Sequence, residues 1–167
     1  MTKGRALTTG EVALGREAFG DGLPYEKIRF VDGAAGNPIA KAAFRNGNSA
    51  ITLRRTIYFS RAYFAADFSA GKPAARGLFT HELTHVWQYE RLGTAWFLLK
   101  YGIQFTRSGF NAPSMYDYEQ GTTPFNRAKL EAQAEMVGHF AEARAEGNAG
   151  KIALIVKNLA GSGIFEL

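Results

Sequence analysis

The stretch "THELTHVWQ", residues 80–88, places two of the chain's three histidines four positions apart with a glutamate between them. The apolar periodicity from about 74 to 92, followed by Gly93, predicts that this stretch lies inside one long helix. Residues four apart lie on the same face of a helix, so His81 and His85 point the same way and are able to share one cation. Gln88 falls on the same stripe, and the packing side carries Phe79, Leu83, Val86 and Trp87.

Glu82 lies just beside the histidine stripe, at an angle from which its carboxylate is able to reach a water on a shared metal ion. The pattern His-Glu-x-x-His requires this of a general base, with the two histidines as ligands. Two histidines at this spacing are also compatible with a surface stripe or with hydrogen-bonded core residues. A catalytic zinc usually has three protein ligands and one position open to water, so the metal hypothesis needs a third ligand elsewhere.

The segment "KLEAQAEMVGHFAEAR", residues 129–144, offers that ligand on a second helix. Glutamates 131, 135 and 142 share one face, and carboxylates one turn apart repel each other unless something positive lies nearby. We predict Glu131 as the third ligand and Glu135 as the acceptor for the free ring N–H of a ligand histidine. His139 is the rival ligand, although it lies further round the helix from Glu131. A solvated acidic helix face is the alternative interpretation of this segment.

The composition is that of one globular domain spanning residues 1–167, with 46% apolar and 21% charged residues. Cys is absent, so any metal must be held by His and carboxylates. The formal net charge is +5, but the basic residues are scattered, so we expect no nucleic-acid partner. No apolar run is long enough to span a bilayer and no signal peptide is recognised, so no membrane partner is expected. The chain is expected to be cytoplasmic, or exported without a signal peptide.

The remaining pattern predicts an α+β fold. Thr9 is expected to cap a first helix that stops at Gly20, and "YEKIRFVDG", residues 25–33, alternates as a strand does. Asn46-Gly47 lies between two apolar stretches and predicts a hairpin, with Arg54-Arg55 marking a bulge or a sheet edge in its second strand. Residues 93–126, with a short helix at 95–104, are expected to form an irregular functional cover, and 152–159 a last helix.

"HELTH", followed by a helix with "EAQAE", resembles the gluzincin class of zinc metallopeptidases. The resemblance implies a zincin-like fold, in which a small sheet with a hairpin packs on the active-site helix beside a second metal-ligand helix. It implies zinc on His81, His85 and Glu131, with Glu82 as the base and Glu135 behind a ligand histidine. Most of the chain is also similar to the small zincin-like domains associated with bacterial contractile injection systems and Rhs- or Vgr-type secretion.

The resulting hypothesis is a zinc-dependent hydrolase that cleaves peptide bonds, in which Glu82 activates a zinc-bound water for attack on a carbonyl. The chain has no separate histidine in the usual place for stabilising the oxyanion, so Tyr116 or Tyr118 is predicted to donate there. The strand near 57–59, if it is an edge, is expected to hold an extended peptide by strand addition. Partners are then a protein or peptide substrate and secretion-system components. The alternatives are a zinc-binding assembly or effector module with little or no catalysis, and an amidase acting on peptidoglycan.

Overall fold

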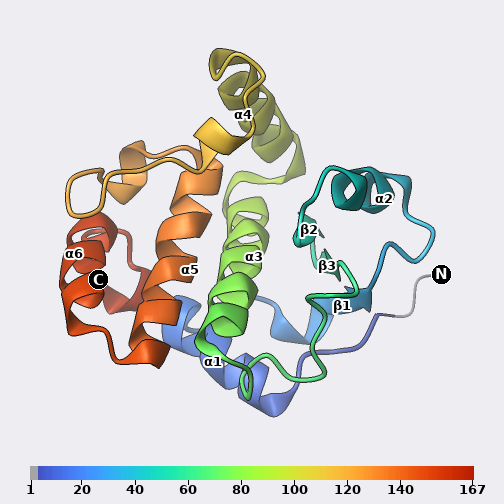
Figure 1. The fold of residues 1–167 in the computed structure, drawn as a ribbon, viewed down its shortest axis with the longest axis horizontal. Helices are drawn as coiled ribbons and strands as arrows, with labels where there is room; N and C mark the ends of the chain where they lie inside the picture. The colour runs from blue at the N-terminus through green and yellow to red at the C-terminus, as the bar shows by residue number, and fades with distance from the viewer. Residues whose placement is uncertain (1–3) are drawn as a thin grey trace.

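The computed structural model describes residues 4–167 and has the expected α+β architecture. In this part of the chain, six α-helices accompany one three-stranded sheet, and α3 runs through the centre between α5 and the sheet (Figure 1). The elements are α1 (Thr9–Phe19), β1 (Arg29–Asp32), α2 (Pro38–Arg45), β2 (Ala50–Leu53), β3 (Thr56–Phe59), α3 (Pro73–Leu92), α4 (Thr94–Arg107), α5 (Leu130–Glu146) and α6 (Ala149–Leu159), with short 3-10 turns at Tyr25–Lys27, Pro113–Met115, Phe125–Arg127 and Ile164–Glu166.

Helix α3 confirms the prediction made from the histidine-bearing stretch. It begins at Pro73, whose fixed φ suits the first turn, and ends before Gly93, which adopts a φ of 75° that glycine tolerates best. Phe79, Leu83 and Val86 are fully buried, as the packing side requires. The helix is therefore fixed at both ends and along its apolar side, so the direction of its polar stripe is determined.

Helix α1 forms as predicted, but its cap is Thr8 and not Thr9. The Thr8 side chain accepts from the Glu11 backbone N–H, and the Glu11 carboxylate accepts from the Thr8 N–H at 2.8 Å. This reciprocal pair satisfies two of the free amides at the helix start, which a cap at Thr9 would leave unpaired. Glu11 is completely buried and also accepts from Arg5 and from the Phe68 N–H, so it ties three segments together.

The hairpin prediction at Asn46-Gly47 is wrong. Asn37 caps α2 through Ile39 and Ala40, and Asn46-Gly47 ends this helix, with Gly47 at φ 88°. The tolerance of Asn and Gly for positive φ serves a helix end as well as a hairpin turn. The true hairpin joins β2 to β3 and turns at Arg54-Arg55, where Arg54 has a φ of 59°.

The strand order β1-β3-β2 also corrects the expected edge. Strand β3 pairs with β1 in parallel and with β2 antiparallel, so Ile57–Phe59 lies in the middle of the sheet and is not free to add a peptide. The strand with a free side near α3 is β2. Its Thr52 is buried and its hydroxyl donates to the Glu82 carboxylate of α3 at 2.6 Å. The sheet therefore presents its β2 edge to the histidine-bearing helix.

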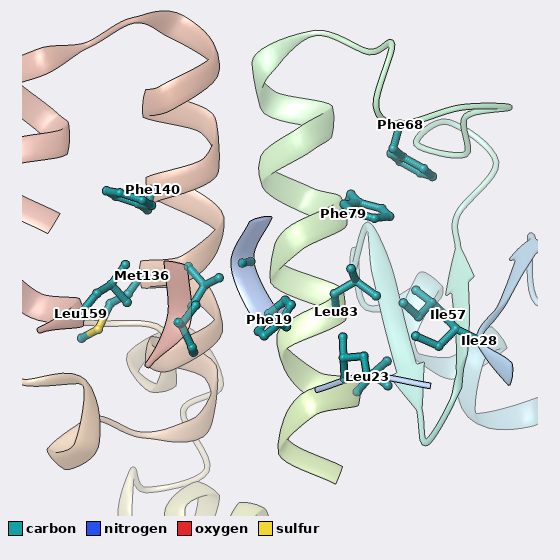
Figure 2. Close-up of a cluster of buried hydrophobic side chains, with 14 of the residues drawn as sticks. Phe19, Leu23, Ile28, Ile57, Phe68, Phe79, Leu83, Met136, Phe140 and Leu159 are labelled. Atoms are coloured by element: carbon teal, nitrogen blue, oxygen red, sulfur yellow. The ribbon is translucent and has the colours of Figure 1, made fainter. Parts of the chain in front are cut away.

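The core lies on two sides of α3. Figure 2 shows Phe79 and Leu83 meeting the side chains of the sheet side, such as Ile57, while Met136, Phe140 and Leu159 pack around α5 and α6. In contrast to the expected short helix at 95–104, α4 spans 14 residues, and the irregular segment begins only after it. None of the helices in residues 4–167 combines the length and the apolar character that crossing a membrane requires.

Two glycines let α3 and α5 approach closely. A Cβ atom at position 138 would lie 2.9 Å from the Gly77 carbonyl oxygen and 3.1 Å from the Cβ of His81. Contacts this short between nonbonded carbon and backbone atoms are repulsive, so a larger residue would push the helices apart. The close approach brings the polar stripe of α3 against the acidic face of α5.

Candidate metal centre

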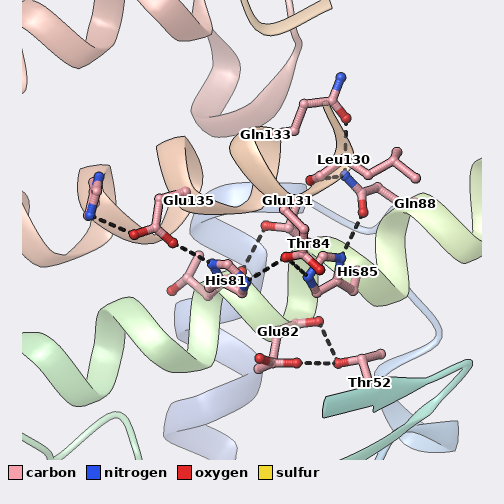
Figure 3. A network of polar contacts seen from close by, with 12 residues as sticks. Thr52, His81, Glu82, Thr84, His85, Gln88, Leu130, Glu131, Gln133 and Glu135 are labelled. Atoms are coloured by element: carbon pink, nitrogen blue, oxygen red, sulfur yellow. Dashed lines mark hydrogen bonds and ion pairs between the residues drawn. The ribbon is translucent and has the colours of Figure 1, made fainter. Parts of the chain in front are cut away.

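The site is formed by side chains from α3 and from the first turn of α5. The Nε2 atoms of His81 and His85 lie 3.5 Å and 3.0 Å from Oε2 of Glu131, and all three residues are buried or nearly so (Figure 3). They are the three residues for which the sequence analysis predicts metal ligation. Within the described residues, this is the group of three or more histidines and carboxylates whose ligand atoms all lie within 4.8 Å of one another.

The geometry and chemistry of this group fit a zinc ion. Ligand atoms at about 2.0–2.2 Å from zinc, arranged tetrahedrally, stand roughly 3.3–3.6 Å apart. The two separations of 3.0 Å and 3.5 Å are close to that spacing, so small side-chain movements suffice to place an ion between the donors. Two imidazoles and one carboxylate form a donor set typical of catalytic zinc. The group is therefore able to bind a metal ion.

The buried side chain of Gln88 determines the tautomer of His85. Nε2 of Gln88 donates to the Leu130 carbonyl oxygen at 2.9 Å and to Oε1 of Gln133 at 3.0 Å, and Gln133 in turn donates to the Phe125 carbonyl oxygen. Backbone carbonyls only accept, so both amides have one permitted orientation. Oε1 of Gln88 then faces Nδ1 of His85 at 2.9 Å, and Nδ1 must carry the proton. This leaves the Nε2 lone pair of the neutral ring directed at the metal position.

Glu135 orients the other histidine. Its Oε2 lies 3.1 Å from Nδ1 of His81, and its Oε1 lies 3.0 Å from Nε2 of His139. The series of hydrogen bonds continues beyond His139, because Nδ1 of His139 lies 2.7 Å from the Tyr118 hydroxyl. The structure therefore places His139 behind Glu135 and outside the group formed with Glu131. Tyr118 is bound to His139 and lines neither of the two cavities described below.

The charges of the group stabilise one another in the metal-free protein. Burial acts to lower the pKa of His81, but hydrogen bonds to Glu131 and Glu135 outweigh it and raise this pKa to about 10. Burial acts to raise the pKa of Glu131, yet the charge of His85 and the bonds to both histidines hold it far below its usual range. Burial is likewise outweighed at Glu135, where bonds from His139 and His81 lower the pKa to about 2. A bound cation would replace the protons on the histidines.

Two cavities meet at the front of the group. The first, of about 340 Å³, is lined by polar residues that include Glu135, and the second, of about 290 Å³, is lined mainly by apolar side chains of β2 and α4. His81, Glu82 and Tyr116 line both cavities. The Tyr116 ring stacks on His81 with centroids 6.0 Å apart, and burial, then the Glu131 carboxylate, raise the pKa of its hydroxyl. Tyr116 thus stays a neutral hydrogen-bond donor at the junction.

Several residues of the site were not assigned roles from the sequence. Gln88 is on the predicted stripe, but its bonding depends on Gln133, which is 45 positions away. Thr52 belongs to a strand whose position the sequence placed wrongly. Tyr101 of α4 lines the apolar cavity, and burial followed by the nearby Glu131 carboxylate raises the pKa of its hydroxyl. An aromatic residue in a helix carries no local signal for such a position, because the position depends on how α4 packs against the end of α3 and the start of α5.

Comparisons with known proteins relate this chain to secretion machinery. The sequence model of the eCIS core domain matches residues 16–93. The type VI secretion system spike protein VgrG2b of Pseudomonas aeruginosa is 33% identical over 88 residues, which are 52% of this chain and 8% of that protein. The chain therefore spans only a small part of that relative's length.

The solved structure of the effector domain of Pseudomonas aeruginosa VgrG2b extends the likeness to nearly the whole fold. It is 28% identical with a TM-score of 0.69, and the alignment covers 95% of this chain and 83% of that one. The structural match includes α5, which lies beyond the residues that the eCIS core domain matches. Together, these similarities link the chain to bacterial secretion and contractile injection systems.

Proposed function

We propose that the chain is a zinc-dependent hydrolase that cleaves peptide bonds, with residues 1–167 forming one zincin-like metallopeptidase domain. His81, His85 and Glu131 are the proposed zinc ligands, and Glu82 is the proposed general base. One observation carries this proposal. Three metal-capable side chains converge where two cavities meet, and the Glu82 carboxylate lies at the same junction.

The chemistry divides between the metal and the side chains of the chain. Zinc, when bound, supplies Lewis acidity, which lowers the pKa of a water and polarises a carbonyl. Glu82 accepts the proton of the water that attacks the carbonyl carbon, and then delivers this proton to the amine that leaves as the C–N bond breaks. Thr52 donates to one oxygen of Glu82 at 2.6 Å, which fixes the carboxylate in the cleft and leaves its other oxygen free for that proton.

Tyr116 is the proposed oxyanion donor of the two tyrosines. Its neutral hydroxyl belongs to a side chain that lines both cavities, whereas the Tyr118 hydroxyl is engaged by His139. A donor at this place stabilises the negative charge that develops on the carbonyl oxygen. The β2 edge beside Glu82 is the proposed support for an extended substrate, because β2 is an outer strand of the sheet and its residues 50–53 line the apolar cavity.

The biological setting follows from the similarity to a spike protein and to an effector domain. We propose that this domain is an effector carried by a secretion or contractile injection system. Its proposed partners are components of that machinery during delivery and a protein or peptide substrate afterwards.

Metal analysis combined with a Glu82→Gln variant tests the proposal. The purified protein should hold one zinc per chain, and Glu82→Gln should keep this zinc while losing roughly 100-fold or more of its activity on a peptide library. Glu17→Gln, an exposed carboxylate on α1, is the matched control and should retain full activity. Absence of stoichiometric zinc, or equal activity of Glu82→Gln and wild type, would contradict the proposal.

A further inference from the structure

Helix α4 carries an exposed apolar face that the metal centre does not use. Trp96, Leu99 and Ile103 lie at spacings of three and four along the helix, so they share one side, and they are 67%, 52% and 43% exposed. Phe110, just past the end of α4, is 70% exposed. We call Trp96, Leu99 and Ile103 the outer face of α4.

The opposite side of α4 is firmly attached to the body of the protein. Phe97 is buried and its ring stacks on Tyr89 of α3 with centroids 3.8 Å apart. Gln104 accepts from the Leu130 N–H at 2.9 Å, and Lys129 donates to Ser108 at 2.9 Å. The exposure of the outer face is therefore not the result of a loosely placed helix. Figure 1 shows α4 projecting from the end of the molecule beyond the sheet and α5, so a broad surface is able to approach it.

The charged residues of α4 and of the segments that flank it, within 91–116, are all positive. Lys100 and Arg107 are exposed and lie within one turn of Trp96 and Ile103, and neither forms an ion pair with another residue in 4–167. The sequence from 91 to 116 contains no aspartate or glutamate. Tryptophan and branched apolar residues flanked by cations, without acidic residues, are typical of helices that lie in the interface of anionic lipid bilayers.

We propose that the outer face of α4 docks on an anionic lipid surface, with the helix parallel to the bilayer plane. A helix of 14 residues is roughly 21 Å long, which suits an interfacial position and is too short to span the hydrocarbon core. Trp96, Leu99 and Ile103 enter the headgroup region, while Lys100 and Arg107 reach the phosphates. The sequence argument against a membrane partner rested on the lack of a segment long enough to span the bilayer, and it does not apply to a helix that lies on the surface.

The docked helix also forms one wall of the apolar cavity in front of the metal centre. Leu98 is 57% exposed, follows Phe97 on α4, and lines the apolar cavity together with Tyr101 and Glu131. The apolar cavity therefore lies beside the docked helix.

Vesicle binding tests this proposal without any measurement of hydrolysis. On centrifugation, the wild-type protein should pellet with vesicles of mixed phosphatidylglycerol and phosphatidylcholine, and much less of it with vesicles of phosphatidylcholine alone. Added salt should weaken the binding to the mixed vesicles. Emission from Trp96 should shift to the blue on binding, and Trp96→Phe should lose this shift while the partly buried Trp87 is unchanged.

Two double variants and one matched control locate the contact. Leu99→Glu/Ile103→Glu removes the apolar contact, and Lys100→Glu/Arg107→Glu removes the charge contact, with a loss of roughly 30-fold or more in partitioning expected for each. Arg61→Glu/Lys72→Glu changes the net charge equally at the opposite end of α3, and should reduce partitioning by less than about threefold. Circular dichroism and zinc content verify that every variant is folded.

Three results would overturn the proposal. The first is no binding of the wild type to anionic vesicles. The second is an equal loss in the α4 variants and in the Arg61/Lys72 control, which would indicate only a general effect of net charge. The third is a wild-type dimer in sedimentation velocity that Leu99→Glu/Ile103→Glu converts to a monomer in the absence of lipid binding, because a second copy would then be the occupant of this face.

Discussion

Replacing Gln88 by methionine should weaken zinc binding, although Gln88 never touches the metal position. Methionine has a similar shape, so the change removes mainly the amide. Three buried groups then lose a partner: the Nδ1–H of His85, the Leu130 carbonyl and the Gln133 amide oxygen. Each such loss costs about 1–3 kcal/mol, so the metal-free protein should unfold at a lower temperature.

The loss at His85 is the one that reaches the metal position. Without the acceptor on Gln88, the ring proton is free to occupy Nε2, the atom that faces Glu131 at 3.0 Å. Loss of an outer hydrogen-bond partner of a metal ligand usually lowers metal affinity by about 10–100-fold, equivalent to roughly 1.4–2.8 kcal/mol. Competition with a fluorescent zinc chelator at neutral pH measures this affinity directly.

Asn158→Leu is the matched control for Gln88→Met. Asn158 is a fully buried amide on α6 that accepts from Gly121 and donates to the Glu119 and Thr123 carbonyls, and it contacts no residue of the metal group. This variant should lose comparable stability and keep zinc affinity within about twofold. If Gln88→Met binds zinc like the wild type, the tautomer argument is wrong. If both variants lose affinity equally, the effect is one of general instability.

Three further predictions concern pH, helix packing and the base. In chelator-treated protein, the raised pKa of His81 contributes stability that is full below its unfolded value of 6.5 and is lost as pH rises toward about 10. The lowered pKa of Glu135 contributes stability that is fully present above pH 4.5 and is lost as pH falls toward about 2. The midpoint temperature of thermal unfolding should therefore be highest between pH 4.5 and 6.5, where both contributions are present. Gly138→Ala should cost about 1–3 kcal/mol by separating α3 from α5, and a calorimetric zinc titration should show weaker binding. Thr52→Val should leave zinc content unchanged in metal analysis and lower peptide cleavage by roughly tenfold, because Glu82 loses its buried donor.

The features predicted correctly from sequence are those that depend on local spacing. The i, i+4 arrangement of His81 and His85 is a property of any helix, and the apolar positions around them require α3 to be that helix. Glu131 was selected because a carboxylate on a second helix needs a positive neighbour, and the structure brings it to both histidines. The contact of Glu131 with His85 spans 46 positions, and it was anticipated from the third ligand that a catalytic zinc requires and not from local spacing.

The predictions that failed required knowledge of which segments meet. Asn46-Gly47 satisfies a helix end and a hairpin turn equally well, and only the Asn37 cap with Pro38 selects the helix. The edge assignment for 57–59 failed because β3 pairs with β1, whose residues lie 27 positions earlier in the sequence than their partners. The outer face of α4 was missed for the same reason, since the sequence does not tell which side of an apolar helix will be covered.

The hydrogen bonds behind the metal group do two things at once. Gln88 binds the Leu130 carbonyl, and Leu130 immediately precedes Glu131, so the amide that orients the His85 ring also holds the turn that carries the third donor. Gln133 extends this hold to Phe125, at the start of the segment leading into α5. Side chains on this rear side are buried and have a single permitted arrangement, whereas the front side has two cavities. A structural zinc site needs four protein ligands that close it, and in residues 4–167 three side chains of the histidine, cysteine and carboxylate classes converge here. The metal group is held rigidly on the side of Gln88 and Gln133 and is open to the two cavities on the other side, an arrangement that favours a catalytic metal site over a structural one.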